Sequence, residues 1–253
     1  MLTTTSYISA LQDLLEKIKV QQAETIRQAG ILIADTLKAG GIVQAFGSGH
    51  SHMVAEEAFF RAGGMVPVNP ILDRRLVFLD GALESTIAER QSGYASEILQ
   101  REDVISKDVA ILISNSGRNA VSVEMALELR SKGLKLIAIT NVNQSRQSAS
   151  RHASGKRLFE IVDIVIDNCA PVGDAVLPLP AQYSNQHIGP VSTIAGVAII
   201  NSIMIEAASE MLRRQVPVPI FPSANLDTSD EWAIKRLLER YNDRIRYFRY
   251  EEQ

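Results

Sequence analysis

Residues 42–51, Ile-Val-Gln-Ala-Phe-Gly-Ser-Gly-His-Ser, constrain the fold more than any other stretch of the chain. Residues 42–46 predict a buried strand, the two glycines predict a tight loop, and residues 51–62 predict a helix. Glycine lets the backbone approach a ligand closely, and a new helix offers unpaired N–H groups and the positive end of its dipole. The loop therefore predicts an anion cradle, and the expected anion is phosphate. Its candidate contacts are Gly47, Ser48, Gly49, His50 and Ser51.

Two familiar phosphate-binding loops do not fit this stretch. A Walker loop requires a Lys-Ser/Thr pair after its last glycine, and none is present. A dinucleotide fingerprint requires a third glycine where this chain has His52, which disfavours a nicotinamide-linked enzyme. Taken alone, a glycine turn between a strand and a helix is also compatible with a plain connection.

The same arrangement occurs again after the apolar run Val109–Ile113. A hydroxyl-rich loop over residues 114–119 follows it, and a helical pattern then continues to about residue 131. In an open parallel sheet such loops gather at the carboxyl ends of the strands, where ligands bind. We therefore expect the serine hydroxyls of both loops to converge on one pocket for a small phosphorylated, polyhydroxylated molecule. The candidate contacts of the second loop are Ser114, Asn115, Ser116, Gly117 and Asn119.

Strands and helices alternate along most of the chain. Further strands are expected over residues 65–68, 135–139 and 161–166, and Asn69-Pro70 is expected to turn the chain after the first of them. Further helices are expected over residues 6–39 and 84–99 and beyond Ser192, with Pro190 at the first turn of the last. This alternation predicts an α/β fold with one doubly wound parallel sheet. A capping box at residues 228–231 predicts a C-terminal helix.

The composition excludes several classes of protein. The chain of 253 residues is 46% hydrophobic and has a net charge of −3, so it can bury a core and has no basic field for nucleic acid. The single cysteine, Cys169, cannot form an internal disulfide, which favours the cytoplasm, and the N-terminus lacks the basic region of a signal peptide. The uncharged run over residues 188–205 contains two glycines and a proline, which favours a buried core helix over a membrane span.

Two stretches carry residues with more than one interpretation. Met53 and Phe60 fall opposite the face of their predicted helix that should pack on the sheet, and we expect them to form a subunit contact. Residues 143–156 combine serines with basic residues. This segment is either an exposed loop or a lid that brings cations over a phosphate, and both interpretations stay open.

The two loops, Ala-Phe-Gly-Ser-Gly-His-Ser and Leu-Ile-Ser-Asn-Ser-Gly-Arg-Asn, resemble the phosphosugar loops of the SIS (sugar isomerase) family, and the similarity extends over residues 40–212. The chain looks closest to small stand-alone bacterial members. The resemblance implies a flavodoxin-like three-layer αβα sandwich in a single domain: an N-terminal helical arm (1–40), a core (41–213) and a C-terminal extension (214–253). It also implies a homodimer or homotetramer, with the arm at a subunit contact. The second loop departs from the family pattern, because Asn119 replaces the usual Thr or Ser.

The resemblance also suggests catalytic residues. In the heptose-phosphate isomerase and etherase branches, a carboxylate lies about ten residues beyond the first loop, where this chain has Arg61. Glu56 and Glu57 are the nearest substitutes, although Glu57 is also placed for an ordinary ion pair with Arg61. In the etherase branch a second catalytic glutamate lies between the two loops, and Glu89 is the nearest candidate by position; the alternative is that Glu89 lies on a solvated helix surface. The candidates are Glu56, Glu57, Glu89 and His187 as acid or base, with Ser192 as a ligand contact.

These residues favour a cytoplasmic enzyme that binds a phosphorylated sugar or amino sugar and isomerises it by acid/base proton transfer. A sugar-phosphate lyase or etherase uses the same groups, and a non-catalytic sugar-phosphate-binding protein is the second alternative. No cofactor is expected. A metal site on His50 and His52 is disfavoured, because two histidines in one loop are a weak pattern. The expected partners are the small-molecule ligand and further copies of the chain, with no nucleic acid and no membrane. The basic, aromatic residues 244–249 are expected to wrap around a partner subunit.

Overall fold

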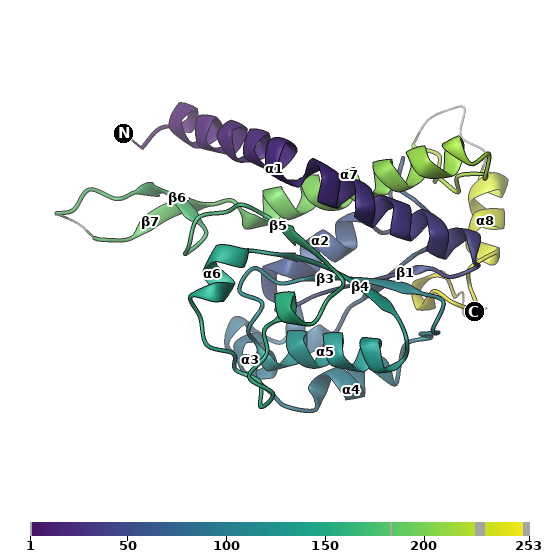
Figure 1. Cartoon of the computed structure of the whole chain (residues 1–253), viewed down its shortest axis with the longest axis horizontal. Coiled ribbons are helices and arrows are strands. Elements are labelled where there is room, and N and C mark those ends of the chain that lie inside the picture. The colour runs from purple at the N-terminus through teal and green to yellow at the C-terminus, as the bar shows by residue number, and fades with distance from the viewer. Residues whose placement is uncertain (1, 183, 226–230, 250–253) are drawn as a thin grey trace.

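A computed structural model describes residues 2–182, 184–225 and 231–249. Its centre is a five-stranded, fully parallel sheet in the order β2-β1-β3-β4-β5 (Figure 1). The strands are β1 (Val43–Gly47), β2 (Val68–Ile71), β3 (Val109–Ile113), β4 (Lys135–Thr140) and β5 (Ile164–Asp167). The order reverses between β1 and β3, and ligands bind at such a switch point in doubly wound sheets. The predicted α/β, flavodoxin-like sheet is confirmed.

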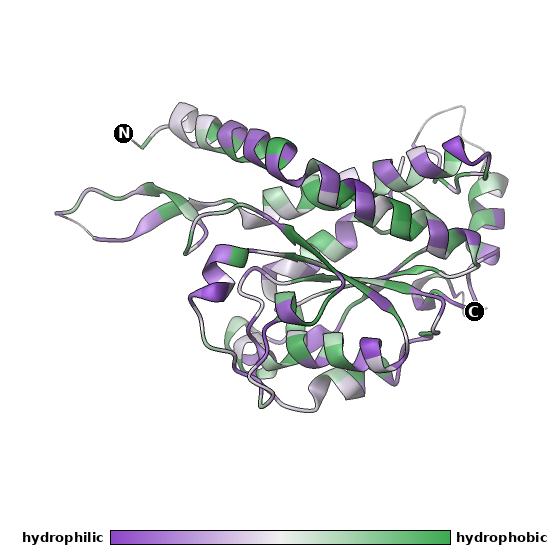
Figure 2. Ribbon diagram, viewed as in Figure 1, coloured by the Kyte–Doolittle hydropathy of each residue, from purple (hydrophilic) through white to green (hydrophobic). Residues whose placement is uncertain are grey.

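Helices cover both faces of the sheet, which gives three layers (Figure 1). One face carries α1 (Thr4–Lys38), α2 (His52–Glu57) and α7 (Ser192–Arg213), and the other carries α3 (Ala82–Ala88), α4 (Tyr94–Leu99) and α5 (Ala120–Ser131). Each layer buries its own apolar cluster against the sheet, and Figure 2 shows hydrophobic residues along the strands and on the helices beside them. Short elements complete the described chain: α6 (Val142–Arg146), α8 (Glu231–Glu239), and the 3-10 turns η1 (Gly49–Ser51), η2 (Arg74–Leu76), η3 (Leu158–Glu160) and η4 (Arg246–Phe248).

The N-terminal arm is one helix of 35 residues that begins with a capping box between Thr3 and Ser6. Gly30 lies within the helix and does not end it. A side chain at this position would meet Glu206 and the backbone of Ala207, so Gly30 lets α1 cross α7 closely. The two helices pack along each other, and α7 is the one described helix long and apolar enough to cross a membrane by length and composition alone. Buried core helices meet that criterion too, and α7 contributes Ile199, Ile200 and Ile203 to the core.

Several predicted boundaries are wrong. The second strand occupies residues 68–71, so Asn69-Pro70 lies within it, and Pro70 is tolerated because β2 is an edge strand. The predicted helix over 84–99 is two helices separated by Gly93. Helix α2 ends at Glu57, well short of residue 62. The strand expected over 161–166 lies at 164–167.

The segment before α7 forms a hairpin that the sequence did not predict. Its strands are β6 (Ala175–Pro178) and β7 (His187–Pro190), and it projects from the molecule beside the start of α1 (Figure 1). Pro190 therefore ends a strand and does not open the helix. The capping box at residues 228–231 falls mostly on residues outside those that the structure describes.

The C-terminal residues 244–249, expected to wrap around a partner subunit, pack against their own chain. Arg244 donates to Asp108 at 2.8 Å, and the Asp108 side chain is fully buried. Phe248 is buried with Ile42 and Val66. The tail thus covers the sheet near the beginning of β1, opposite the strand ends that carry the two loops.

Candidate functional site

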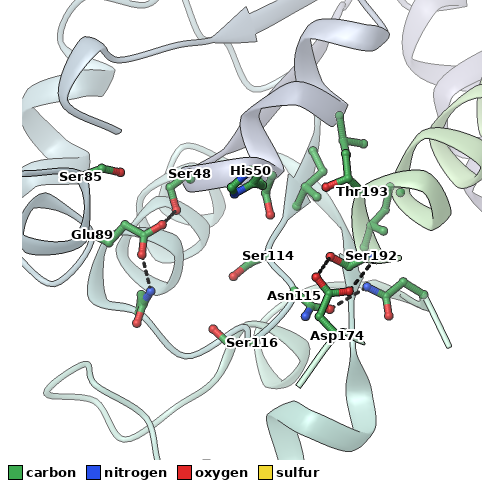
Figure 3. A pocket seen from close by; sticks show the side chains of 18 of the residues that line it. Ser48, His50, Ser85, Glu89, Ser114, Asn115, Ser116, Asp174, Ser192 and Thr193 are labelled. Carbon is green, nitrogen blue, oxygen red and sulfur yellow. Dashed lines mark hydrogen bonds between the residues drawn. The ribbon is translucent and has the colours of Figure 1, made fainter. Parts of the chain in front are cut away.

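The two predicted loops line one cavity of about 340 Å³ at the carboxyl ends of β1 and β3 (Figure 3). Gly47 pairs with Ile113 in the sheet, so the loops begin side by side. Ser48, Ser51, Ser114 and Ser116 all line the cavity, as do His50, Asn115 and Asn119. Its volume suits a small ligand, and its lining of hydroxyl and amide groups suits a polyhydroxylated one.

Glu89 closes one side of this cavity, between the two loops. Its Oε1 accepts a hydrogen bond of 2.7 Å from the Ser48 hydroxyl, and its Oε2 accepts one of 2.8 Å from the Asn119 amide. The backbone carbonyl of Glu89 accepts from Val121 N in the first turn of α5. Glu89 is thus attached to both loops, and the interpretation as a solvated surface residue does not describe its position.

The second loop has the features of an anion cradle. The Ser114 hydroxyl accepts from Gly117 N at 3.1 Å, which fixes the turn. The backbone N–H groups of Asn115, Ser116 and Arg118 donate to no acceptor among the described residues. Because α5 begins directly after this loop, its positive dipole end adds to them. An anion at this loop would find several donors that need no rearrangement.

The third side of the cavity is formed by the beginning of α7. Asp174, at the base of the hairpin, accepts from Val191 N at 3.1 Å and from Ser192 N at 2.7 Å. Its second oxygen accepts from the Ser192 hydroxyl at 2.8 Å (Figure 3). Asp174 therefore caps α7 from outside the helix. Ser192 lines the cavity as predicted, but its hydroxyl is already held by Asp174.

The two histidines of the first loop point to different surroundings. His50 lines the cavity, and its ring lies 5.1 Å from the ring of Phe78. His52 contacts the carbonyl of Gly49 through Nδ1, and its Nε2 lies 3.8 Å from a Glu56 oxygen. Across residues 2–182, 184–225 and 231–249, no group of three or more His, Cys, Asp or Glu side chains is arranged to hold a metal ion.

Three of the predicted acid/base residues lie outside the cavity. Glu56 is half exposed on α2, beside His52. Glu57 pairs with Arg61 and accepts from Asn201 on α7 at 3.1 Å, on a different part of the surface. His187 lies on the exposed hairpin, beside a separate depression next to α1. Of the four predicted acid/base residues, only Glu89 reaches the cavity.

Several lining residues were not among the predicted ones. Polar ones among them are Ser85, Thr86, Gln144, Asn168 and Asp174. Asn168 directly follows β5, so the rule that placed the two loops at strand ends could have found it. It donates to Asn115 Oδ1 at 2.8 Å and so orients that side chain. Asp174 and Thr86 carry no comparable sequence pattern.

Among the described residues, no lysine or arginine lines the cavity. Arg90 and Arg118 each neighbour a lining residue in sequence, and Arg151 is hydrogen-bonded to one. Arg151 donates to Asn119 Oδ1 at 2.9 Å. Burial, followed by the like charges of Arg118 and Arg90, lowers the pKa of Arg151 from its usual value. The other basic residues of segment 143–156 include Arg146, which lies over Phe159, and His152, which faces Glu124 at 3.7 Å. Arg151 is thus the basic residue of this segment that contacts the site.

A parallel sheet of this order, with two hydroxyl-rich loops around one cavity, is the arrangement that the sequence resemblance implied. The chain belongs to the SIS domain family, whose model matches residues 6–141. It is similar along nearly its whole length to bacterial UPF0309 proteins. One from Geobacillus thermodenitrificans is 39% identical over 239 residues, covering 94% of this chain and 95% of that protein. One from Halalkalibacterium halodurans is 40% identical over 243 residues, covering 95% of each.

Among solved structures, the chain is similar to the phosphoheptose isomerase GmhA from Neisseria gonorrhoeae. The TM-score is 0.51, and the match covers 81% of this chain and 96% of that protein. At 14% sequence identity this likeness shows a common fold and no more.

Proposed function

We propose that this protein binds a phosphorylated sugar or amino sugar in the cavity between the two loops. The observation that supports it most directly is the convergence of Ser48, Ser51, Ser114 and Ser116 on one polar cavity. The phosphate is assigned to the second loop, where unpaired backbone N–H groups and the beginning of α5 favour an anion. The sugar then extends toward Glu89 and His50. The phosphosugar isomerase named among the solved structures is consistent with this ligand class.

We further propose aldose–ketose isomerisation with Glu89 as the base. The reaction moves a proton between the first two carbons of the sugar, so it needs one group that removes and returns the proton and one that protonates the carbonyl oxygen. Glu89 is the carboxylate in the cavity that is not committed to a helix end, since Asp174 caps α7. His50 is the imidazole that lines the same cavity, and we assign it the oxygen. Glu89 moves the proton from the second carbon to the first, while His50 gives a proton to the carbonyl oxygen and takes one from the neighbouring hydroxyl, so no other reactant is required.

Proton exchange tests this assignment directly. A panel of hexose, heptose and hexosamine phosphates is incubated with the protein in D₂O, and NMR follows product formation and the deuterium that enters at the first carbon of a ketose product or at the second carbon of the aldose. The wild type should turn over at least one of them, and Glu89→Gln should be about 100-fold slower or more. The matched control is Glu97→Gln, an exposed glutamate on α4, which should keep wild-type activity. Undiminished turnover in Glu89→Gln contradicts the role of Glu89.

The same experiment separates the alternatives. A lyase or etherase also begins by removing a proton, but its product lacks the leaving group, which NMR detects. A non-catalytic binding protein gains stability from a sugar phosphate and yields neither product nor deuterium exchange. Glu56 and Glu57 lie outside the cavity, so they are not placed to replace Glu89 as the base. A wild type that is stabilised by a sugar phosphate but yields neither product nor exchange therefore supports the non-catalytic alternative.

We also propose that the chain self-associates through its α2–α7 side. Ile205 and Leu212 lie two turns apart on one side of α7 and are each 67% exposed, and Met53 on α2 is 45% exposed. On this proposal, a second copy of the chain covers these apolar side chains. Sedimentation equilibrium tests this: Ile205→Glu together with Leu212→Glu should lower the oligomeric mass. An unchanged mass in the double variant, or a monomeric wild type, contradicts it.

A further inference from the structure

We propose that Asn119 and Arg151 form a positioning relay that holds the carboxylate of Glu89 in the orientation needed for proton transfer. The inference rests on the proposed function, because it concerns how the assigned base is held. It differs from the expectation drawn from the family pattern, in which residue 119 is a Thr or Ser that contacts phosphate.

The relay is a chain of three side chains from three separate segments. Arg151 donates to Asn119 Oδ1 at 2.9 Å, and Asn119 Nδ2 donates to Glu89 Oε2 at 2.8 Å. The backbone supports the same arrangement, since Arg151 N donates to the carbonyl of Arg118 at 2.8 Å. Segment 143–156 is thereby joined to the second loop at the residue before Asn119.

The hydrogen-bonding groups of Arg151 and Glu89 allow only one orientation of the Asn119 amide. A guanidinium only donates hydrogen bonds, so it requires the amide oxygen, and an ionised carboxylate only accepts, so it requires the amide nitrogen. Both requirements are met by the same rotation of the amide. A threonine or serine hydroxyl is shorter and has a single proton, so it would not span the two groups in this way.

The contacts of the Arg151 side chain are consistent with a role in holding Asn119. Within the described part of the chain it has no carboxylate within ion-pair distance, and Asn119 is its hydrogen-bonded side-chain partner. Its charge acts on Glu89 through the amide, and hydrogen bonds that involve an ionised group are the stronger ones. On the other side of the carboxylate, the Ser48 hydroxyl holds Oε1. Glu89 is therefore fixed at both oxygens.

The test compares variants of Asn119 that present different hydrogen-bonding groups to the Glu89 carboxylate. Asn119→Asp is close to Asn in shape but places an acceptor against an acceptor, whereas Asn119→Leu removes the donor to Glu89 and the acceptor for Arg151 without adding a charge. The relay predicts that Asn119→Asp has the lower kcat of the two, although it is the milder change in shape. Arg151→Met should lower kcat about three- to tenfold, the value of one hydrogen bond, and leave KM within about twofold. Arg130→Met, an arginine paired with Asp163 at the far end of α5, is the control and should behave as the wild type.

The outcomes distinguish the relay from the proposed function. If Glu89→Gln abolishes turnover while Arg151→Met and both Asn119 variants keep the wild-type kcat, the base assignment stands and the relay is wrong. If Arg151→Met raises KM and leaves kcat unchanged, Arg151 contacts the substrate and the relay is again wrong. Crystal structures of the wild type, Arg151→Met and Asn119→Leu test the geometry without any substrate. The relay predicts a rotated or poorly ordered Glu89 carboxylate in both variants, and an unchanged Glu89 overturns it whatever the panel shows.

Discussion

The hydroxyl of Ser48 and the carboxylate of Glu89 lie 2.7 Å apart, although 41 residues separate them in the chain. Ser48 follows the interior strand β1, and Glu89 follows the short helix α3 on the other side of the cavity. Their contact joins the first loop to the segment between the loops. It also makes the site sensitive to a change at Gly49, because a Cβ there would press on the carboxylate.

Gly49→Ala should impair the site more than it destabilises the fold. Gly49 has φ of +54°, and a Cβ there would lie 3.1 Å from Glu89 Oε1. The left-handed backbone should cost roughly 1 kcal/mol of the free energy of unfolding. The contact with Glu89 should lower turnover or ligand affinity in addition. Gly63→Ala is the control, because it has a φ of +76° and open space around it. Equal effects of both variants on ligand binding would contradict the account.

Asp174→Asn should weaken the beginning of α7. Asn keeps the shape and tolerates the left-handed backbone of this residue, whose φ is +71°. It removes the negative charge that accepts from Val191 N and Ser192 N, and we expect a loss of about 1 kcal/mol in urea unfolding. Asp103→Asn, which breaks a half-exposed pair with Arg249, should change the stability little. A stability of Asp174→Asn equal to the wild type would show that α7 needs no cap from the hairpin.

Gly30→Ala should destabilise the protein, although alanine is the better helix former. Propensity alone would favour alanine by about 1 kcal/mol. The new Cβ, however, would meet the Cβ of Glu206 and the backbone of α7, so the two helices would have to separate. Overpacking of this kind costs typically about 1–3 kcal/mol, and the net effect should be a lower urea midpoint. A midpoint above that of the wild type would mean that α1 and α7 do not cross as closely as described.

Glu102 should make the stability depend on pH. Burial raises the pKa of Glu102 above its ordinary value of 4.5, although Asn69 donates to it and Arg246 lies 3.4 Å away. Between the ordinary pKa of 4.5, which applies to the unfolded state, and the raised pKa of the folded state, the folded state binds more protons than the unfolded state. The free energy of unfolding therefore falls as the pH rises from the first pKa to the second. Urea midpoints measured from pH 4 to pH 8 should show this decline, and Glu102→Gln should reduce it. An equal decline in Glu102→Gln would exclude Glu102 as its source.

The parts of the fold that repeat a local pattern could be predicted from the sequence. Strand β3 was predicted at its observed residues, because five apolar residues are followed directly by polar ones. The loops after β1 and β3 were placed at one cavity by the rule for parallel sheets, without knowledge of any contact. The second strand was misplaced, because Pro70 resembles a turn residue unless its position at the sheet edge is known.

The parts of the site that depend on long-range contacts could not be predicted. Glu56 and Glu57 lie close to the first loop in sequence, but α2 turns them away from the cavity. Glu89 was one candidate of several until its bonds to Ser48 and Asn119 were seen. Asp174 was not predicted at all. It caps α7 through a contact between the base of the hairpin and the start of the helix, and no local sequence pattern indicates that contact.

The central claim is that one sugar phosphate occupies the cavity between the two loops. The most direct measurement is the electron density of crystals soaked with glucosamine 6-phosphate, and separately with glucose 6-phosphate. The account predicts that the phosphate lies on the loop over residues 114–119 and that the first two carbons lie within about 3.5 Å of the Glu89 carboxylate. A phosphate bound elsewhere on the protein, with the cavity empty, would contradict it.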